Sequence, residues 1–132
     1  MSMNKVIVTG GAGFIGSNLV ERLLKDGAEE ILIIDDFSTG KKENLHDSSK
    51  VHLIESKLED INDLESQFKG YDFCFHLAAG VGVQYIMDNL SDSLLTNIQG
   101  THIVFEACKV NNIPVMITST SEIYGTSKEE RW

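Results

Sequence analysis

Residues Thr9 to Gly16 read TGGAGFIG, and this stretch decides the fold. It follows a short apolar run, Lys5 to Val8, and it precedes a helical pattern from Phe14 to Lys25. A strand that turns tightly into a helix needs backbone conformations that a Cβ obstructs, so glycines are expected at such a turn. The sequence therefore predicts a strand, a glycine-rich turn and a helix in direct succession.

The glycine spacing fits two dinucleotide-binding frames at once. Gly11, Gly13 and Gly16 fit G-x-G-x-x-G, whereas Gly10, Gly13 and Gly16 fit the wider frame G-x-x-G-x-x-G. In either frame a pyrophosphate lies at the helix N-terminus, where backbone N–H groups and the positive end of the helix dipole face it. The last glycine lets the helix pack closely on the strand. Because a strand precedes the turn and a helix follows it, we predict a dinucleotide site here.

Carboxylates follow the second apolar run, where a ribose-binding acid is expected. Ile31 to Ile34 reads as a buried strand, and Asp35 and Asp36 stand at its end. A carboxylate there accepts hydrogen bonds from both hydroxyls of an adenosine ribose and repels a 2′-phosphate, so we predict NAD rather than NADP. Lys41 and Lys42 moderate that preference because they bring positive charge nearby. The competing interpretation is that both aspartates are only polar residues that end a strand.

The composition limits the possible partners. The chain has 132 residues, 42% of them hydrophobic, which suits one domain with a single core. Its formal net charge is −9 and no basic patch is visible, so we expect neither nucleic acid nor an anionic membrane as a partner. Since no apolar run approaches membrane-spanning length and the N-terminus lacks a signal-peptide pattern, we expect a cytoplasmic protein.

The two cysteines, Cys74 and Cys108, lie in a strand-like and a helix-like run respectively. Neither has a second cysteine or a histidine at metal-ligand spacing. We therefore expect two buried free thiols and predict no metal site.

Apolar runs alternate with helical patterns along the whole chain, which predicts an α/β protein with a parallel, doubly wound sheet. Such sheets bind ligands at the carboxyl ends of their strands, where the strand order reverses. The expected strands are residues 5–8, 31–34, 51–54, 71–77 and 114–118, and the expected helices are 14–25, 60–68 and 91–110, with 38–50 as a loop or short helix. The apolar face expected for the first helix consists of Phe14, Ile15, Leu19, Leu23 and Leu24.

Five segments together resemble the extended short-chain dehydrogenase/reductase family, specifically its NAD-dependent nucleotide-sugar epimerases and dehydratases. They are TGGAGFIGSNL, DDFSTGKKENL, HLAAGVGV, TNIQGTHIVFEA and TSTSEIYG. The resemblance implies a Rossmann-type doubly wound parallel sheet, with residues 1–132 forming the NAD-binding, N-terminal five-strand portion of such an enzyme. HLAAGVGV and TSTSEIYG are most similar to the UDP-glucuronate decarboxylase and related UDP-sugar epimerase branch.

The resemblance also implies which residues would bind NAD. The glycine turn, with the amides of Phe14 and Ile15, would hold the pyrophosphate, and Asp35 would bind the adenosine ribose. Asn97 would stabilise the inner helix beside the cofactor, unless it is an ordinary polar helix residue. The implied cofactor-binding residues are Gly10, Gly13, Phe14, Ile15, Gly16, Asp35, Asp36, Leu58, Leu77, Ala78, Ala79, Asn97 and Thr118, of which Leu77 to Ala79 would line the nicotinamide-side ribose.

One departure from the family pattern concerns adenine. Family members usually carry Gly-Asp after the third strand, where the aspartate contacts the adenine ring. Ser56 and Lys57 stand at those positions here, which puts that contact in doubt. Leu58 is the residue that could still pack against the ring.

Two residues after the last strand resemble catalytic groups. Thr120 occupies the place of the family's catalytic Ser/Thr, which hydrogen-bonds the sugar hydroxyl being oxidised and holds it where a base takes its proton. Glu122 matches a carboxylate that decarboxylase-like members place near the sugar. The competing interpretations are that Thr120 only caps a turn and that Glu122 has no role in sugar chemistry.

The family's catalytic Tyr-x-x-x-Lys and its sugar-binding domain come later in the chain than TSTSEIYG. Tyr124 and Lys128 match that spacing, but they align with the Tyr-Gly after the fifth strand, and Gly125 stands between them. We therefore expect the 132-residue chain alone to be inactive or nearly so. The full-length parent is expected to act on a UDP-sugar through a 4-keto intermediate.

Other functions remain open on the sequence. One is a non-catalytic NAD(P)-binding module or a sensor-like remnant. Another is a doubly wound protein that binds a mononucleotide or a flavin, although Asp35 and the three-glycine spacing disfavour it. Relatives dimerise through the long helix, so a homodimer through residues 91–110 is a further expectation.

Overall fold

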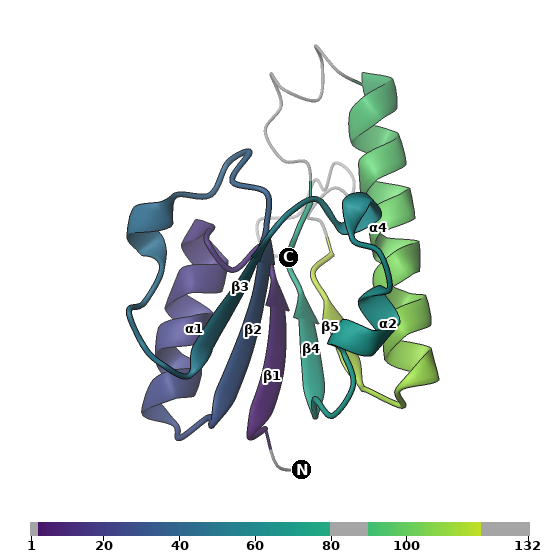
Figure 1. Ribbon diagram of the computed structural model, residues 1–132. Helices are drawn as coiled ribbons and strands as arrows, with labels where there is room; N and C mark the ends of the chain where they lie inside the picture. The colour runs from purple at the N-terminus through teal and green to yellow at the C-terminus, as the bar shows by residue number, and fades with distance from the viewer. Residues whose placement is uncertain (1–2, 80–89, 120–132) are drawn as a thin grey trace, which may run out of the picture.

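A parallel sheet with helices on both faces organises the chain (Figure 1). The computed structural model describes residues 3–79 and 90–119. Within them the strand order is β3-β2-β1-β4-β5, and all neighbouring strands are parallel. The strands are β1 (Lys5–Thr9), β2 (Glu30–Asp35), β3 (Val51–Glu55), β4 (Phe73–His76) and β5 (Val115–Ile117). The predicted α/β class and doubly wound topology are confirmed, and the order reverses beside β1, where such sheets bind ligands.

The helices divide between the two faces of the sheet (Figure 1). Helix α1 (Phe14–Lys25) packs on one face, and α2 (Leu64–Gln67) and α4 (Leu90–Val110) pack on the other. Two short 3-10 turns, η1 (Lys42–Asn44) and η2 (Leu58–Asp60), lie in the connections. No helix in the described part of the chain combines the length and the apolar character needed to cross a membrane.

The side chains of the strands alternate between the two faces of the sheet and form two separate cores. Because successive side chains of a strand point to opposite faces, Ile7 packs toward α4 while its neighbours Val6 and Val8 pack toward α1. Covering both faces requires nearly continuous apolar strands, and β1 and β2 have them. The α4-side core includes Ile7, Leu32, Ile34, Phe68, Cys74 and Val104, and the α1-side core includes Val6, Val8, Val20, Leu23, Ile31 and Ile33.

The first turn of α1 differs from the expected apolar face. Phe14 is 85% exposed and Ile15 is 65% exposed, so the expectation that they join the buried face is wrong. Leu19, Leu23 and Leu24 do pack against the α1-side core. The difference arises from position around the helix: at 100° per residue, Phe14 and Ile15 lie about 120° or more from Val20, on the side that faces away from the sheet. The residues that α1 buries are Gly16, Ser17, Val20 and Leu23.

The helix expected over residues 60–68 is shorter than predicted, because the α-helix begins only at Leu64. Asp63 is its N-cap: it adopts a left-handed conformation with φ of 60°, and its side chain accepts a hydrogen bond from the Ser66 N–H at 3.3 Å. A helix of four residues, α2, follows this cap. The helix expected over 14–25 has the predicted ends in α1. The remaining expected elements are present with shifted ends; the strand expected over 71–77 is the shorter β4.

Both cysteines are buried and free, as predicted. Cys74 lies on β4 and Cys108 on α4, so the pair joins the sheet to the helix in the α4-side core. The hydrogen bond with Cys108 and burial both raise the pKa of the Cys74 thiol. Cys74 therefore stays a neutral thiol that packs like a small apolar residue.

Replacing Phe68 by Ala should destabilise the protein strongly. Its side chain is fully buried, so the change removes apolar contacts and leaves a cavity, at a cost of about 3–5 kcal/mol. Phe14→Ala is the matched control; the exposed ring should contribute only about 0.5 kcal/mol. Urea unfolding followed by circular dichroism measures both, and equal losses would contradict the assignment of the core.

Candidate dinucleotide-binding site

The glycine turn closes tightly over the carboxyl ends of β1 and β2. Gly10 has a left-handed φ of 72°, and its N–H donates to the Ile34 carbonyl at 2.8 Å. The Gly13 N–H donates to the Gly10 carbonyl at 3.2 Å, which closes the turn. A Cβ on Gly16 would overlap that same carbonyl oxygen, so only glycine lets α1 start this close to the strand.

The N-terminus of α1 has neither a capping side chain nor an acidic side chain, so it can bind an anion. Its N-cap, Gly13, has no side chain to cap the helix, and the first turn contains no acidic residue. The first N–H groups of a helix lack intrahelical acceptors, and the helix dipole adds positive potential there. The exposed side chains of Phe14 and Ile15 lie at this same end. A pyrophosphate fits this combination, as the glycine spacing predicts.

Asp35 lies directly beside the turn. Its side chain is nearly buried, with the residue 8% exposed. One carboxylate oxygen accepts the Ala12 N–H at 2.8 Å, and the other accepts the Phe37 N–H at 2.9 Å. An ionised carboxylate has about four acceptor positions, so two bonds leave capacity for ribose hydroxyls. The structure therefore brings the predicted ribose-binding acid and the glycine turn together.

The segment after β2 also holds the turn, which the sequence did not indicate. The Ala12 carbonyl accepts the Lys41 N–H at 3.1 Å and the Asn44 side-chain amide at 2.8 Å. A Cβ on Gly40 would lie 2.9 Å from an Asp35 carboxylate oxygen and 3.1 Å from the Ala12 carbonyl carbon, so a side chain there would displace one of them. The sequence showed only a polar stretch expected to be a loop or short helix. These hydrogen bonds to the glycine turn join residues about 30 positions apart in the chain, so local sequence patterns do not predict them.

Asp36 differs from its neighbour. It is exposed, and one of its carboxylate oxygens accepts the Ser38 N–H at 2.9 Å and the Ser38 hydroxyl at 2.6 Å. This is an Asx turn, in which the side chain shapes its own loop. A ribose contact for Asp36 stays a prediction, since the observed bonds explain the residue as part of a turn.

The segment after β4 lies against the first glycine. The Thr9 hydroxyl oxygen accepts the Ala78 N–H at 3.1 Å and shares the Leu77 N–H, at 3.2 Å, with the Thr9 carbonyl. A Cβ on Gly10 would lie 2.8 Å from the Ala78 nitrogen, so the two backbones touch. Leu77, Ala78 and the exposed Ala79 thus follow β4 at the same edge of the sheet as the glycine turn.

The remaining predicted residues belong to η2, to α4 and to the chain after β5. Leu58 is 8% exposed and packs in the α4-side core beside Gly100, so its adenine contact stays a prediction. Asn97 is half-buried on α4, and Thr118 is exposed just after β5. Thr120 and Glu122 lie outside the described residues, as do Tyr124, Gly125 and Lys128.

His76 is a site residue that the sequence analysis passed over. It is 2% exposed at the end of β4; its Nδ1 lies 2.7 Å from the Thr9 hydroxyl oxygen, and its Nε2 lies 3.0 Å from that of Thr101. Burial lowers the pKa of His76 from 6.5 to about 4, so the ring is neutral at pH 7. The available signal was a histidine inside an apolar strand run, which must find polar partners when buried.

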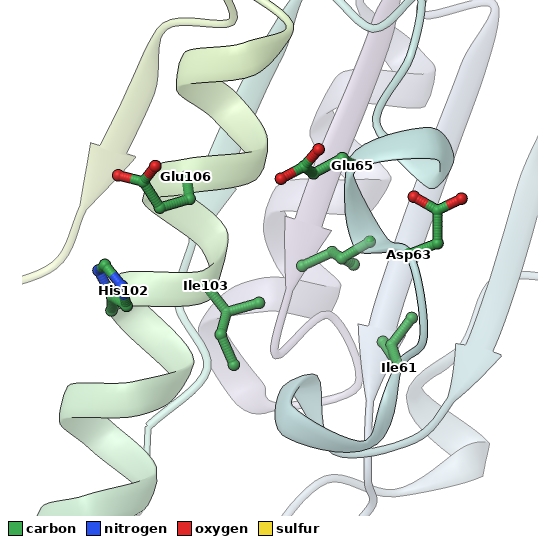
Figure 2. A pocket seen from close by; sticks show the side chains of 7 residues that line it. Ile61, Asp63, Glu65, His102, Ile103 and Glu106 are labelled. Carbon is green, nitrogen blue, oxygen red and sulfur yellow. The ribbon is translucent and has the colours of Figure 1, made fainter.

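A separate groove lies between α2 and α4 (Figure 2). Its volume is about 460 Å³, and no residue of the glycine turn lines it. Acidic side chains stand at its rim, which does not suit an anionic dinucleotide, and in the described residues no three His, Cys, Asp or Glu side chains gather as a metal would require. The lining residues are Ile61, Asp63, Leu64, Glu65, His102, Ile103 and Glu106.

These contacts define a dinucleotide-binding α/β protein, because turn, helix end and acid converge where the strand order reverses. Comparison with known families agrees: residues 6–131 match the model of the NAD dependent epimerase/dehydratase family. The chain belongs to this family. The resemblance to nucleotide-sugar epimerases and dehydratases is thereby confirmed.

Individual relatives cover the chain almost completely. It is 35% identical over 122 residues to UDP-N-acetyl-alpha-D-glucosaminuronate decarboxylase of Bacillus cytotoxicus, covering 92% of this chain and 38% of that protein. A UDP-N-acetylglucosamine 4-epimerase of Methanobrevibacter ruminantium, solved with UDP-N-acetylmuramic acid, superposes with a TM-score of 0.89 at 38% identity, covering 100% of this chain and 43% of that one. The Bordetella bronchiseptica enzyme WbmG, solved with NAD, gives 0.84 at 32% identity, covering 98% and 41%.

The stability of the protein should depend on pH through His76. The unfolded chain protonates this ring near pH 6.5, but the folded chain does so only near pH 4. As pH falls through that window, protons bind the unfolded state preferentially, so the free energy of unfolding decreases, by about 2–3 kcal/mol at pH 4.5.

Urea unfolding at pH 7.0 and pH 4.5 measures this dependence. His76→Asn is the comparison, because a variant without the ring lacks this contribution and should lose about 2–3 kcal/mol less between the two pH values. The same pH dependence in both proteins would contradict a neutral, buried His76.

Proposed function

We propose that this chain is the NAD-binding portion of a nucleotide-sugar epimerase, dehydratase or decarboxylase that works through a 4-keto-sugar intermediate. The observation that carries the proposal is the nearly buried Asp35 carboxylate, held on the glycine turn by the Ala12 N–H at 2.8 Å. The solved WbmG structure contains NAD, and the relatives are named for UDP-sugar chemistry. The chain spans 38% of the length of the Bacillus relative.

The residues of the turn fit NAD in a consistent order. The N–H groups at the start of α1, from Phe14 and Ile15 onward, would face the pyrophosphate. Gly10, Gly13 and Gly16 leave the backbone bare beside it, since a Cβ at any of them meets backbone at 3.3 Å or less. The remaining acceptor positions of Asp35 would take the adenosine ribose hydroxyls. Leu77 to Ala79 would lie along the nicotinamide-side ribose.

Charge near Asp35 favours NAD over NADP. A 2′-phosphate would meet the Asp35 carboxylate at short range, with little water between them. Of the two nearby lysines that could offset this repulsion, Lys42 is engaged elsewhere: its Nζ lies 2.7 Å from a Glu55 carboxylate oxygen and 5.2 Å from the centre of the Phe37 ring. The exposed Lys41 still moderates the preference, which therefore rests on the Asp35 carboxylate.

The sugar would bind at the same edge of the sheet, beyond β5. When bound, NAD⁺ accepts a hydride from C4 of the sugar. Thr120 would hydrogen-bond the C4 hydroxyl and hold its proton toward a base, and Glu122 would lie near the sugar. A UDP-sugar is the proposed substrate, in keeping with the relatives' names. Two free, buried cysteines suit the reducing cytoplasm, where we place the protein.

Asp35→Asn should weaken NAD binding about 10- to 100-fold, because hydrogen bonds to a charged acceptor contribute about 1.5–3 kcal/mol. Asp47→Asn is the matched control, since that carboxylate is exposed and is not among the predicted site residues. Isothermal titration with NAD⁺ and NADP⁺ measures both variants. In the unchanged chain NADP⁺ should bind at least about tenfold more weakly than NAD⁺.

Thermal unfolding separates lost binding from lost structure in this experiment. Asp35→Asn must remain folded at the titration temperature for the comparison to count. If the folded variant binds NAD⁺ as tightly as the unchanged chain, Asp35 does not bind the ribose and the proposal is wrong.

We further infer a homodimer through α4. Leu94 is 57% exposed, Ile98 59% and Phe105 39%, although all three are large and apolar. At 100° per residue they fall within about 40° of one another around the helix, which makes a single stripe. An apolar stripe of this kind marks a contact surface. A second copy of the chain fits it because the same stripe is then buried on both partners.

The double variant Leu94→Ser/Ile98→Ser should therefore be monomeric at concentrations where the unchanged protein is a dimer. Val110→Ser is the control: Val110 is 57% exposed on α4 but lies well away from the stripe. Sedimentation velocity gives the mass of each species. A monomeric unchanged protein, or a dimer that survives the double change, would contradict this interface.

A further inference from the structure

A chain of hydrogen bonds runs beneath the glycine turn and ends on α4. The Thr9 hydroxyl, fully buried at the end of β1, lies 2.7 Å from His76 Nδ1 on β4. On the other side of the ring, Nε2 lies 3.0 Å from the Thr101 hydroxyl on α4. Two strands and a helix are thus joined through one imidazole, at the edge of the sheet where the cofactor is proposed to bind.

The direction of each bond follows from what the groups can donate. The Thr9 oxygen accepts the Ala78 N–H and part of the Leu77 N–H, so its two lone pairs are in use. Its own hydrogen then has one partner at 2.7 Å, Nδ1 of His76, which must accept. A neutral imidazole with a free Nδ1 carries its proton on Nε2, and that proton is donated to Thr101.

The direction of the Thr9–His76 hydrogen bond fixes the backbone at Leu77 and Ala78. Because Thr9 donates to His76, its lone pairs stay available for the amides of Leu77 and Ala78. The peptide between those residues lies against Gly10, where a Cβ would come within 2.8 Å of the Ala78 nitrogen. If Nδ1 donated instead, three donors would compete for one oxygen and the Ala78 amide would lose its acceptor.

We propose that Thr9, His76 and Thr101 act as positioning residues, whose directed hydrogen bonds hold the Leu77–Ala78 peptide in place for the nicotinamide half of the cofactor. This inference rests on the proposed NAD site. It assigns to Thr101, on the far side of His76 from Thr9, an effect on cofactor binding that is transmitted through the ring.

Thr9→Val tests the positioning role because it keeps the shape of the side chain and removes the hydroxyl. It should weaken NAD⁺ binding about tenfold, while Thr9→Ser, which restores the hydroxyl, should stay within about threefold of the unchanged chain. ADP carries the adenosine and the pyrophosphate but no nicotinamide riboside. Its affinity should therefore change less than about threefold in Thr9→Val, whereas a general loss of structure would weaken both ligands equally.

Thr101→Val tests transmission through the ring. It should also weaken NAD⁺ more than ADP, and Thr101→Ser should restore binding. Because both residues act through His76, Thr9→Val/Thr101→Val should lose little more than Thr9→Val alone, and the departure from additivity measures their coupling. Nitrogen-15 NMR of the unchanged chain at pH 7 should show His76 with its proton on Nε2.

The outcomes separate this inference from the proposed function. If the unchanged chain does not bind NAD⁺, the proposed function fails, and the positioning role fails with it. If it binds NAD⁺ but Thr9→Val binds equally well, or loses NAD⁺ and ADP to the same extent, only the positioning role is overturned. A His76 proton on Nδ1 overturns the direction of the hydrogen bonds, whatever the ligand affinities are.

Discussion

The hydrogen bond from the Ala12 N–H to the Asp35 carboxylate is the contact on which the proposed site depends. It ties the glycine turn after β1 to the end of β2, and it aims a nearly buried negative charge at the place where the turn is bare of side chains. Without it the turn and the acid would be neighbours in space but not parts of one surface. The carboxylate is stable there because backbone N–H groups replace the water it gives up.

A second constraint acts on the other side of β1. The Thr9 hydroxyl attaches the start of the segment after β4 to the same turn, as Asp35 does from β2. The two side chains stand at the ends of neighbouring strands, which is the geometry that a parallel sheet produces where its order reverses. A cofactor that spans both sides of β1 would therefore meet backbone positioned from both directions.

Much of this arrangement was predictable from the sequence, because it rests on local signals. The glycine spacing, the apolar strands and the acid after β2 each follow from steric or solvation rules that act within a few residues, and the family match confirms the class. The exposed ring of Phe14 was missed because the buried side of that first turn consists of Gly16 and Ser17, small residues that apolar periodicity does not detect. His76 and Asn44 were missed because their partners lie 67 and 32 residues away in the chain.

The hydrogen bonds of the Ala12 backbone have a consequence beyond the glycine turn. The Ala12 N–H is bound from the end of β2, and its carbonyl is bound by two groups from the Lys41–Asn44 segment. Three stretches of chain, namely the glycine turn, the end of β2 and the Lys41–Asn44 segment, thus meet at one residue, and none of them can shift without breaking bonds made by the others. A ligand that drew Asp35 tighter against the turn would therefore also restrain the surface segment 40–44, a connection that sequence alone presents as an ordinary polar loop.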